Sequence, residues 1–252
     1  MKTVAIVPVF DHGATVGAVA ATLRAHGLPV ILVDDGSHAP CAQTLDALLA
    51  AGAARDWPPL VLLRHTENRG KGAAVLTGLV HAQTLGATHA VQVDADGQHD
   101  LEALPAFLEA SAANPRAVIN GCPRYDDSVS RGRLYGRYLT HLWVWINTLS
   151  LRIADSMCGF RVYPLAAVMP LLPALRHAKR MDFDPEILVR LDWAAVPIVN
   201  LPVRVRYPAD GLSHFQPWRD NLRISAMHAR LFFGMLRRCP RLLAWHVRGN
   251  RV

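Results

Sequence analysis

The stretch HAVQVDADGQHD, residues 89–100, places two aspartates one residue apart at the end of an apolar run. A short apolar run that is bounded by turn residues predicts a buried strand. In an open α/β sheet, ligands bind at the edge formed by the carboxyl ends of the strands. Asp94 and Asp96 therefore indicate a ligand site at the end of a central strand.

Strand-like and helix-like segments alternate through the first half of the chain. The apolar pattern predicts strands over 3–9, 29–35, 60–65, 89–96 and 116–121, and helices over 14–26, 40–53, 70–86 and 101–112. Strands that alternate with helices predict an α/β fold with a mainly parallel, doubly wound sheet and helices on both faces. In the less regular second half we expect strands over 158–164 and 196–207, a helix over 183–194 and a loop over 208–215.

Composition limits the class of protein. A chain of 252 residues with 51% hydrophobic residues can bury the core of one α/β domain, which excludes wholesale disorder. The four cysteines are scattered without a CxxC pair, which is typical of a reducing compartment and not of a disulfide framework or zinc site. We recognise no signal peptide, and the apolar stretch 138–151 is too short to cross a bilayer. We therefore expect a cytoplasmic protein that is soluble or peripheral on the inner face of the membrane.

The positive charge is concentrated at the end of the chain. The net charge is +7, and the segment from Arg219 onward holds eight arginines and one acid, so this segment supplies the whole excess. We expect a domain over 1–217 and a basic amphipathic helix and tail over 218–252. The helix would offer the acyl region of a membrane the apolar residues Leu222, Leu231, Phe232, Phe233, Met235 and Leu236.

The partner of this basic segment is expected to be an anionic membrane surface. No nucleic-acid reading motif accompanies the arginines, so nucleic acid is the weakest candidate partner. The alternative is a helix that packs on the domain and leaves its arginines in water.

Clustered acids need a counter-charge. Asp34 and Asp35 end the second expected strand, and Asp94 and Asp96 end the fourth. A hard divalent ion, Mg²⁺ or Mn²⁺, prefers oxygen ligands and bridges carboxylates to substrate phosphates. The alternative is that these aspartates cap backbone amides. The first turn lacks GxGxxG, and no GxxxxGK[ST] loop occurs, so a Rossmann dehydrogenase or a P-loop protein fits poorly.

Several motifs in order carry a family resemblance. They are AIVPVFD (5–11), VDDGS (33–37), ENRGKGAAVLTGL (67–79), VDADGQ (93–98), DSMCGFRVY (155–163), FDPEILVRL (183–191) and GLSHF (211–215). In this order the chain resembles the family 2 glycosyltransferases of the GT-A fold, and most of all the polyprenyl- and dolichyl-phosphate sugar synthases. The resemblance implies inverting transfer of a sugar from a nucleotide-diphosphate donor, UDP- or GDP-linked, with a divalent metal.

The resemblance also implies roles for single residues. Asp94 and Asp96 would bind the metal and diphosphate, and Asp96 would thereby serve catalysis. Asp184 would be the catalytic base. The other implied contacts are Pro8 and Asp35 in the nucleotide pocket, Gln98 near the donor sugar, and Arg161 and Ser213 near the phosphates.

Some positions allow two readings or depart from the family. Lys71 either reaches a diphosphate or is solvated at a helix start, and Asp155 either acts on the acceptor or orients the CGF strand. Phe10 and Asp11 are candidate substrate contacts, but with His12 they replace a frequent Tyr-Asn-Glu, which leaves the nucleobase open. His214 stands where relatives with GxSK carry Lys.

The leading hypothesis is a metal-dependent transferase that acts on a lipid or lipid-phosphate acceptor at the membrane face. The alternatives are a soluble transferase for a small-molecule or pigment-like lipid hydroxyl, an idle GT-A domain that serves as an assembly partner, and a nucleotidyltransferase on a similar fold.

Overall fold

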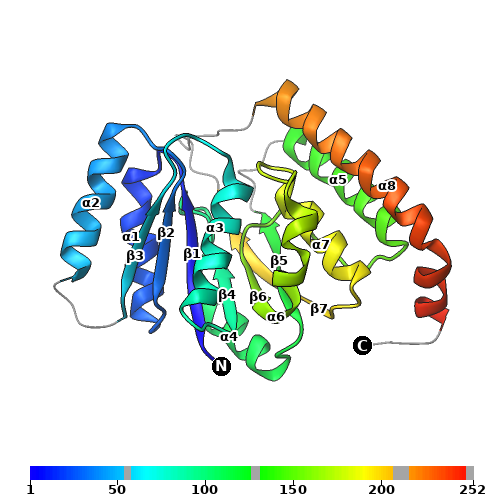
Figure 1. Ribbon diagram of the computed structural model, residues 1–252, viewed down its shortest axis with the longest axis horizontal. Helices are drawn as coiled ribbons and strands as arrows, with labels where there is room; N and C mark the ends of the chain where they lie inside the picture. Colours follow the sequence, from blue (N-terminus) through cyan, green and yellow to red (C-terminus); the bar gives the residue numbers. More distant parts are fainter. Residues whose placement is uncertain (54–57, 126–130, 207–215, 248–252) are drawn as a thin grey trace.

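The computed structural model describes residues 1–53, 58–125, 131–206 and 216–247 (Figure 1). The described residues form one sheet in the order β3-β2-β1-β4-β6-β5-β7. Its strands are β1 (Thr3–Val9), β2 (Val30–Asp34), β3 (Leu60–Arg64), β4 (His89–Gln92), β5 (Val118–Tyr125), β6 (Arg161–Pro164) and β7 (Ile198–Val205). The helices are α1 (Gly13–Ala25), α2 (Ala39–Ala53), α3 (Lys71–Thr84), α4 (Leu104–Ala113), α5 (Arg131–Thr148), α6 (Leu165–Val168), α7 (Phe183–Trp193) and α8 (Pro217–Val247). Two 3₁₀ segments, Leu101–Ala103 and Met169–Leu175, precede α4 and α7.

The first four strands are parallel, as expected. Ile6 of β1 pairs with Ile31 of β2 on one side and with Gln92 of β4 on the other. Strand β4 is shorter than the expected 89–96, because the chain leaves the sheet after Gln92 and turns at residues 95–97. Asp94 and Asp96 therefore lie in the loop beyond the strand, at the carboxyl edge of the sheet.

The second half of the sheet is mixed. Strand β6 is antiparallel to both of its neighbours, β4 and β5, and β7 pairs in parallel with β5 along its whole length. The expected mainly parallel sheet with helices on both faces is confirmed, with β6 as its antiparallel member.

Two apolar cores lie on opposite faces of the sheet. One contains side chains of α1, α2 and α4, with Val16, Leu45 and Phe107 fully or almost fully buried. The other contains side chains of α3, α5, α7 and α8, including Val75 and Leu188. Successive residues of a strand point to opposite faces, so the buried run of β1 feeds both cores.

Helices α5 and α8 lie side by side at the end of the molecule remote from α2 (Figure 1). The sequence pattern did not predict α5, and α8 is longer than the expected 218–238. One face of α8 packs on the domain, where Ile224 and Met227 join the core. Leu231 and Met235, which the sequence assigns to the acyl region, are also buried on this face, so that part of the expectation is wrong. None of the described helices combines the length and the hydropathy needed to cross a bilayer.

Candidate active site

Three side chains that are distant in sequence converge at the carboxyl edge of the sheet. Lys71 begins α3, Asp94 follows β4, and Asp184 lies in the first turn of α7. The Nζ atom of Lys71 donates to Oδ2 of Asp94 and to Oδ2 of Asp184, at 2.8 Å in each case. Lys71 is thus not solvated at a helix start, which was one of its two readings.

The fold brings Lys71 to this position through two glycines. Gly70 has a φ of 103°, which side chains rarely allow, and a Cβ there would collide with the backbone of Lys179. A Cβ at Gly72 would lie 2.5 Å from the carbonyl oxygen of Ala178. The two glycines of the RGKG sequence therefore let the start of α3 pack closely against the segment that leads into α7.

The neighbouring charges determine the protonation of Lys71 and Asp94. Burial alone would lower the pKa of Lys71, but the carboxylates of Asp184 and Asp94 hold it above its usual value. Burial would likewise raise the pKa of Asp94, but Lys71 and His99 hold it below its usual value. Lys71 therefore stays a cation and Asp94 an anion across the physiological range.

A buried network of hydrogen bonds holds the carboxylate of Asp184 in place. Gln92, the last residue of β4, donates from Nε2 to Oδ1 of Asp184 at 3.2 Å, and Tyr163 donates its hydroxyl to Gln92 Oε1 at 3.2 Å. Both carboxylate oxygens of Asp184 thus accept a hydrogen bond, one from Gln92 and one from Lys71. Burial raises the pKa of Tyr163 to about 12, which keeps its hydroxyl a donor.

Arg161 is fully buried beneath this network. Its guanidinium donates to the backbone oxygens of Asp184 (2.7 Å) and Ser156 (2.8 Å), and to Asn120 Oδ1 (3.0 Å). It therefore ties the start of α7 to the 155–160 loop. The guanidinium donors of Arg161 are thus directed to groups inside the protein. The contact of Arg161 with a phosphate, which the resemblance implies, stays a prediction.

Asp35 holds the loop that leads to Lys71. It accepts hydrogen bonds from the backbone N–H groups of Arg69 (2.9 Å) and Gly70 (2.7 Å) and contacts His65 Nδ1 at 2.7 Å. Its side chain is almost fully buried. Its hydrogen bonds among the described residues go to His65, Arg69 and Gly70 and not to the start of α2, so these contacts do not support the alternative reading as a helix cap. Its proposed contact with the nucleotide remains untested.

The loop after β4 has a geometry that suits a hard cation. Oδ1 of Asp94 is buried and has no hydrogen-bond partner among the described residues, whereas Oδ2 is bonded to Lys71. Asp96 is half-buried and accepts the N–H group of Gln98 at 3.0 Å. No group of three or more His, Cys, Asp or Glu side chains that could hold a metal occurs in the described part of the chain. Two carboxylates fit an ion that takes its other ligands from a diphosphate and water.

Gly159 lies against the Asp94 carboxylate. A Cβ at position 159 would overlap both oxygens of Asp94, so only glycine leaves room for this side chain. His99 lies near the opposite side, with Nε2 3.7 Å from Asp94 Oδ2. The G of the CGF motif and the H of DGQH thus shape the Asp94 site, and the sequence reading had given neither of them a role.

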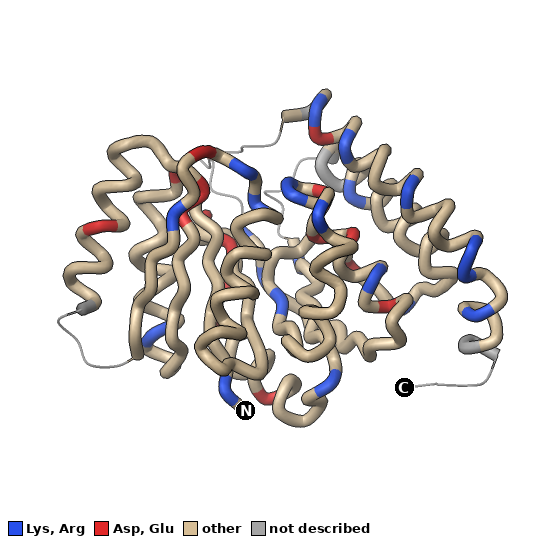
Figure 2. Tube along the Cα trace, viewed as in Figure 1, with Lys and Arg blue, Asp and Glu red and all other residues tan. Residues whose placement is uncertain are grey.

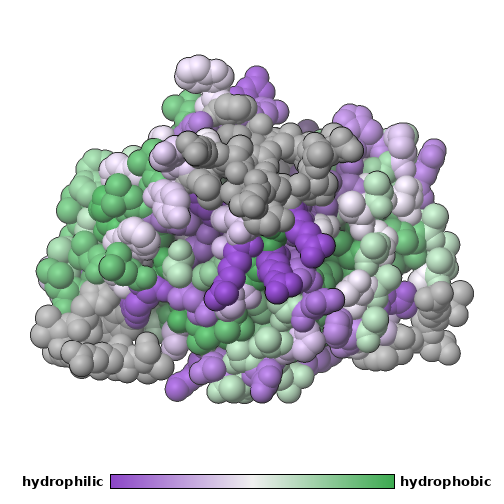
Figure 3. Space-filling model, turned by 180° about the vertical axis from the view of Figure 1, so that it is seen from behind, coloured by the Kyte–Doolittle hydropathy of each residue, from purple (hydrophilic) through white to green (hydrophobic). Residues whose placement is uncertain are grey.

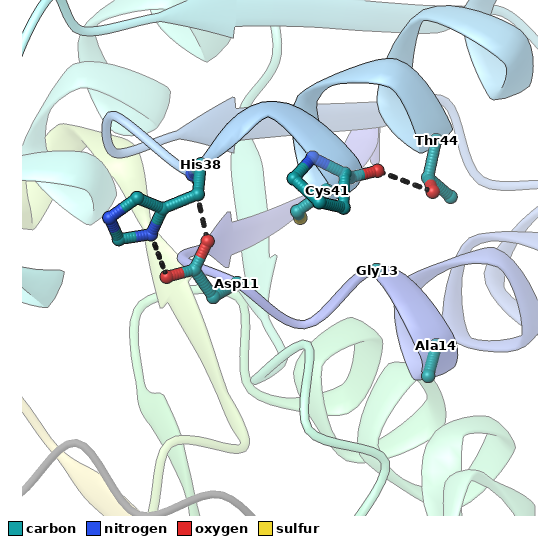
Figure 4. A pocket seen from close by; sticks show the side chains of 7 residues that line it. Asp11, Gly13, Ala14, His38, Cys41 and Thr44 are labelled. Atoms are coloured by element: carbon teal, nitrogen blue, oxygen red, sulfur yellow. Dashed lines mark hydrogen bonds and ion pairs between the residues drawn. The ribbon is translucent and has the colours of Figure 1, made fainter.

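The loop after β1 lines a pocket between the starts of α1 and α2 (Figure 4). Pro8 is buried within β1 opposite Val33, and Phe10 lies 6.1 Å from the His38 ring, centroid to centroid. Asp11 has a φ of 58° and contacts His38 Nδ1 at 2.6 Å through its carboxylate. Figure 4 shows this contact, with Gly13 of α1 lying opposite Cys41 of α2.

Asp155 has a structural role in the described residues. It accepts hydrogen bonds from the backbone N–H groups of Met157 and Cys158, at 2.9 and 2.8 Å. Arg137 of α5 binds both of its oxygens, at 2.6 and 2.7 Å, and His141 approaches at 3.1 Å. The reading that Asp155 orients the CGF strand fits these contacts. Ser213 and the GLSHF motif lie outside the described residues.

Comparison with known proteins gives the family of the chain. The sequence profile of glycosyl transferase family 2 matches residues 4–168. The chain belongs to this family, which confirms the resemblance drawn from the order of the motifs. It is 25% identical over 215 residues to a dolichyl-phosphate β-glucosyltransferase of Dictyostelium discoideum, covering 82% of this chain and 63% of that one. It is 26% identical over 216 residues to an undecaprenyl-phosphate mannosyltransferase of Micrococcus luteus, covering 81% and 83%.

Solved structures of similar fold include two transferases. One is glucosyl-3-phosphoglycerate synthase of Mycobacterium tuberculosis, solved with Mn²⁺, UDP-glucose and phosphoglyceric acid (TM-score 0.60, 14% identity, 93% of this chain and 79% of that one). The other is a mannosyltransferase of Pyrobaculum calidifontis, solved with GDP-Man and Mn²⁺ (TM-score 0.56, 15% identity, 100% and 76%). At these identities the likeness establishes the fold alone, and it confirms the expected GT-A class.

Proposed function

We propose that this protein is a metal-dependent inverting glycosyltransferase that moves a sugar from a nucleoside-diphosphate sugar to a lipid-linked phosphate. The observation that carries the proposal is the convergence of Lys71, Asp94 and Asp184 at the carboxyl edge of a sheet of the GT-A class. This arrangement places a fixed cation and two acids where doubly wound sheets bind their ligands. The relatives of the chain, a dolichyl-phosphate β-glucosyltransferase and an undecaprenyl-phosphate mannosyltransferase, support the acceptor class.

Asp94 and Asp96 would hold the divalent ion together with the diphosphate of the donor. When bound, the ion supplies neutralisation of the charge that develops on the leaving nucleoside diphosphate. Lys71 adds a second positive charge at the same place and is held there by Asp184. Mn²⁺ in the two solved transferases supports a divalent ion, and Mg²⁺ fits the same oxygen donors.

The contacts of Asp184 help to distinguish a hydroxyl acceptor from a phosphate acceptor. A hydroxyl acceptor needs a base to take its proton. Oδ2 of Asp184 is bonded to Lys71 and Oδ1 to Gln92, and the residue is buried, so a hydroxyl acceptor would have to reach the remaining lone pairs of a carboxylate with little exposed surface. A phosphate acceptor is an anion before it reacts and needs no such base. The burial of Asp184 and its contact with Lys71 therefore favour a phosphate acceptor, with Asp184 acting mainly to position Lys71.

The test is a transfer assay with UDP-glucose, UDP-N-acetylglucosamine and GDP-mannose as donors. Each donor is combined with a polyprenyl phosphate, the matching polyprenol, or phosphoglyceric acid, with Mn²⁺ or with EDTA. The proposal requires a metal-dependent product on the polyprenyl phosphate for at least one donor. Transfer only to the polyprenol or to phosphoglyceric acid would contradict the proposed phosphate acceptor. It would favour the alternative, a transferase that acts on a hydroxyl group.

A further inference from the structure

The outward face of α5 is apolar. Its exposed side chains are Tyr135, Tyr138, Leu139, Leu142 and Trp143, with exposed fractions of 38–73%. Its polar residues Thr140 and His141 are instead buried against the domain. This arrangement is the reverse of the usual amphipathic surface helix, in which polar residues face water.

Helix α8 presents three faces. Ile224, Met227, Leu231, Met235 and Leu242 are buried against the domain. Positions three, four and seven apart share a helix face, so a second, exposed apolar face is formed by Trp218, Leu222, Phe233, Leu236 and Leu243. The face between these two carries arginines at positions 219, 223, 230, 237 and 241. Figure 2 shows the basic residues spaced along the whole helix.

The exposed faces of the two helices are continuous. Trp143 of α5 packs edge-on against Phe232 of α8, with ring centroids 6.4 Å apart, and stacks on His228 at 6.0 Å. Ten of the fourteen most exposed large apolar side chains of the described residues lie on these two helices. Figure 3 shows hydrophobic residues gathered at the left of the view, over α5 and α8. A monomeric protein rarely exposes so large an apolar patch without a partner.

The arginines indicate the charge of that partner. Arg230 is paired with Glu186 of α7 and Arg223 with Asp220, but Arg219, Arg237 and Arg241 have no ion pair with any described residue. The pKa of Arg238 lies below its usual value because of its burial and the nearby guanidiniums of Arg190, Arg241 and Arg237. This concentration of like charge beside an apolar face is complementary to a surface that is both apolar and anionic.

We propose that the exposed faces of α5 and α8 form a single docking surface for an anionic lipid bilayer, with apolar side chains in the acyl boundary and arginines at the lipid phosphates. The Tyr and Trp side chains suit the headgroup level. The inference rests on the proposed function, because a lipid-phosphate acceptor presents its reacting group at such a surface. It extends that function by assigning the membrane contact to a surface that α5 and α8 form together.

The inner face of the same surface connects to the active site. Arg137 and His141 of α5 hold Asp155, whose loop continues to Gly159 against Asp94. On the other helix, Arg230 binds Glu186, two residues beyond Asp184 on α7. Docking of α5 and α8 on a membrane would therefore fix the orientation of the Asp94–Lys71–Asp184 site relative to the lipid surface.

The test is co-sedimentation of the full-length chain with vesicles of phosphatidylcholine, with and without phosphatidylglycerol. The docking variant combines Leu139→Gln, Leu142→Gln, Phe233→Gln and Leu236→Gln. All four side chains are exposed, and substitution of exposed side chains usually changes the free energy of unfolding little. The matched control combines Val80→Gln and Leu85→Gln, two exposed apolar positions at α3, away from the surface. Nucleotide-sugar binding in solution is measured for all three proteins.

We expect wild type and control to bind anionic vesicles in a salt-sensitive way, and the docking variant to lose about tenfold or more in partitioning. Nucleotide-sugar binding should be equal in all three proteins. Absence of vesicle binding by wild type at low salt, or equal binding by the docking variant, would overturn the inference. If wild type is a dimer that does not bind vesicles, and the docking variant is a monomer, the surface is an interface with a second copy of the chain. Vesicle binding without nucleotide-sugar binding would leave the docking surface standing and remove the proposed function.

Discussion

Lys71 and Asp184 are 113 residues apart in the chain, yet Nζ of Lys71 lies 2.8 Å from Oδ2 of Asp184. The same ammonium is 2.8 Å from Asp94, so one cation holds the expected metal ligand and the expected catalytic base together. Lys71 therefore organises the site before any donor is bound.

Replacement of Lys71 should damage both stability and activity. Lys71→Met removes the cation that lies 2.8 Å from both Asp94 and Asp184, which costs about 3–5 kcal/mol for a broken buried pair. It also removes a positioned cation, a loss of about 10²–10³ in kcat. Urea unfolding and steady-state kinetics measure the two effects. Lys179→Met, at an exposed lysine, is the control, and equal behaviour of both variants would show that Lys71 is dispensable.

A methyl group at position 159 should displace the Asp94 carboxylate. Gly159→Ala places a Cβ on both oxygens of Asp94, and a shift of about 1 Å in a catalytic group can cost about 10²-fold in rate. Gly136→Ala on α5 is the matched control, because a Cβ there meets no atom within 4 Å. Kinetics of both variants provide the measurement. Full activity of Gly159→Ala would mean that the position of Asp94 is not critical.

The effect of Asp184→Asn should depend on the acceptor. With a hydroxyl acceptor the variant should lose about 10²–10⁴-fold, the usual contribution of a general base. With a polyprenyl phosphate the loss should be much smaller, because no proton has to be removed. The measurement is kcat/KM for both acceptors with the same donor. Equal losses for the two acceptors would argue against any base role.

The free energy of unfolding should decrease as the pH is lowered, because of His228 on α8. Burial lowers the pKa of His228 from 6.5 to about 4 in the folded protein, so the unfolded chain binds the extra proton between these values. The stabilisation is therefore complete above pH 6.5 and is lost as the pH falls toward 4, by on the order of 3 kcal/mol. Urea unfolding of wild type and His228→Gln across this range measures the difference. An unchanged pH dependence in the variant would exclude His228 as its source.

The sequence predicted the first half of the fold well, and the reason is physical. Strands such as Val30–Asp34 are continuous apolar runs, and the helices between them show a clear period and glycine stops. A strand was expected over 158–164, but the antiparallel position of β6 between β4 and β5 could not be predicted in this way. Its four residues pair with β4 and β5 through contacts that no local pattern encodes.

Helix α5 escaped prediction because its polarity is inverted. The stretch around Tyr138 and Leu142 is apolar on the side that faces outward, while Arg137 and His141 are turned inward to hold Asp155. A search for an apolar face that meets the core therefore fails here. The ordered motifs identified Asp94 and Asp184, but the contact of both with Lys71 arises from the packing of α3 against α7.

The central claim is that Asp94 and Asp96 bind a nucleoside-diphosphate sugar through a divalent ion. Titration calorimetry of UDP and GDP, with Mn²⁺ or with EDTA, on wild type and Asp96→Asn tests it most directly. Asp46→Asn on α2, whose carboxylate is exposed, is the control. At least one nucleotide should bind wild type and the control only with Mn²⁺, and Asp96→Asn should lose this binding while its unfolding curve is unchanged. Binding that is equal with EDTA, or equal in Asp96→Asn, would contradict it.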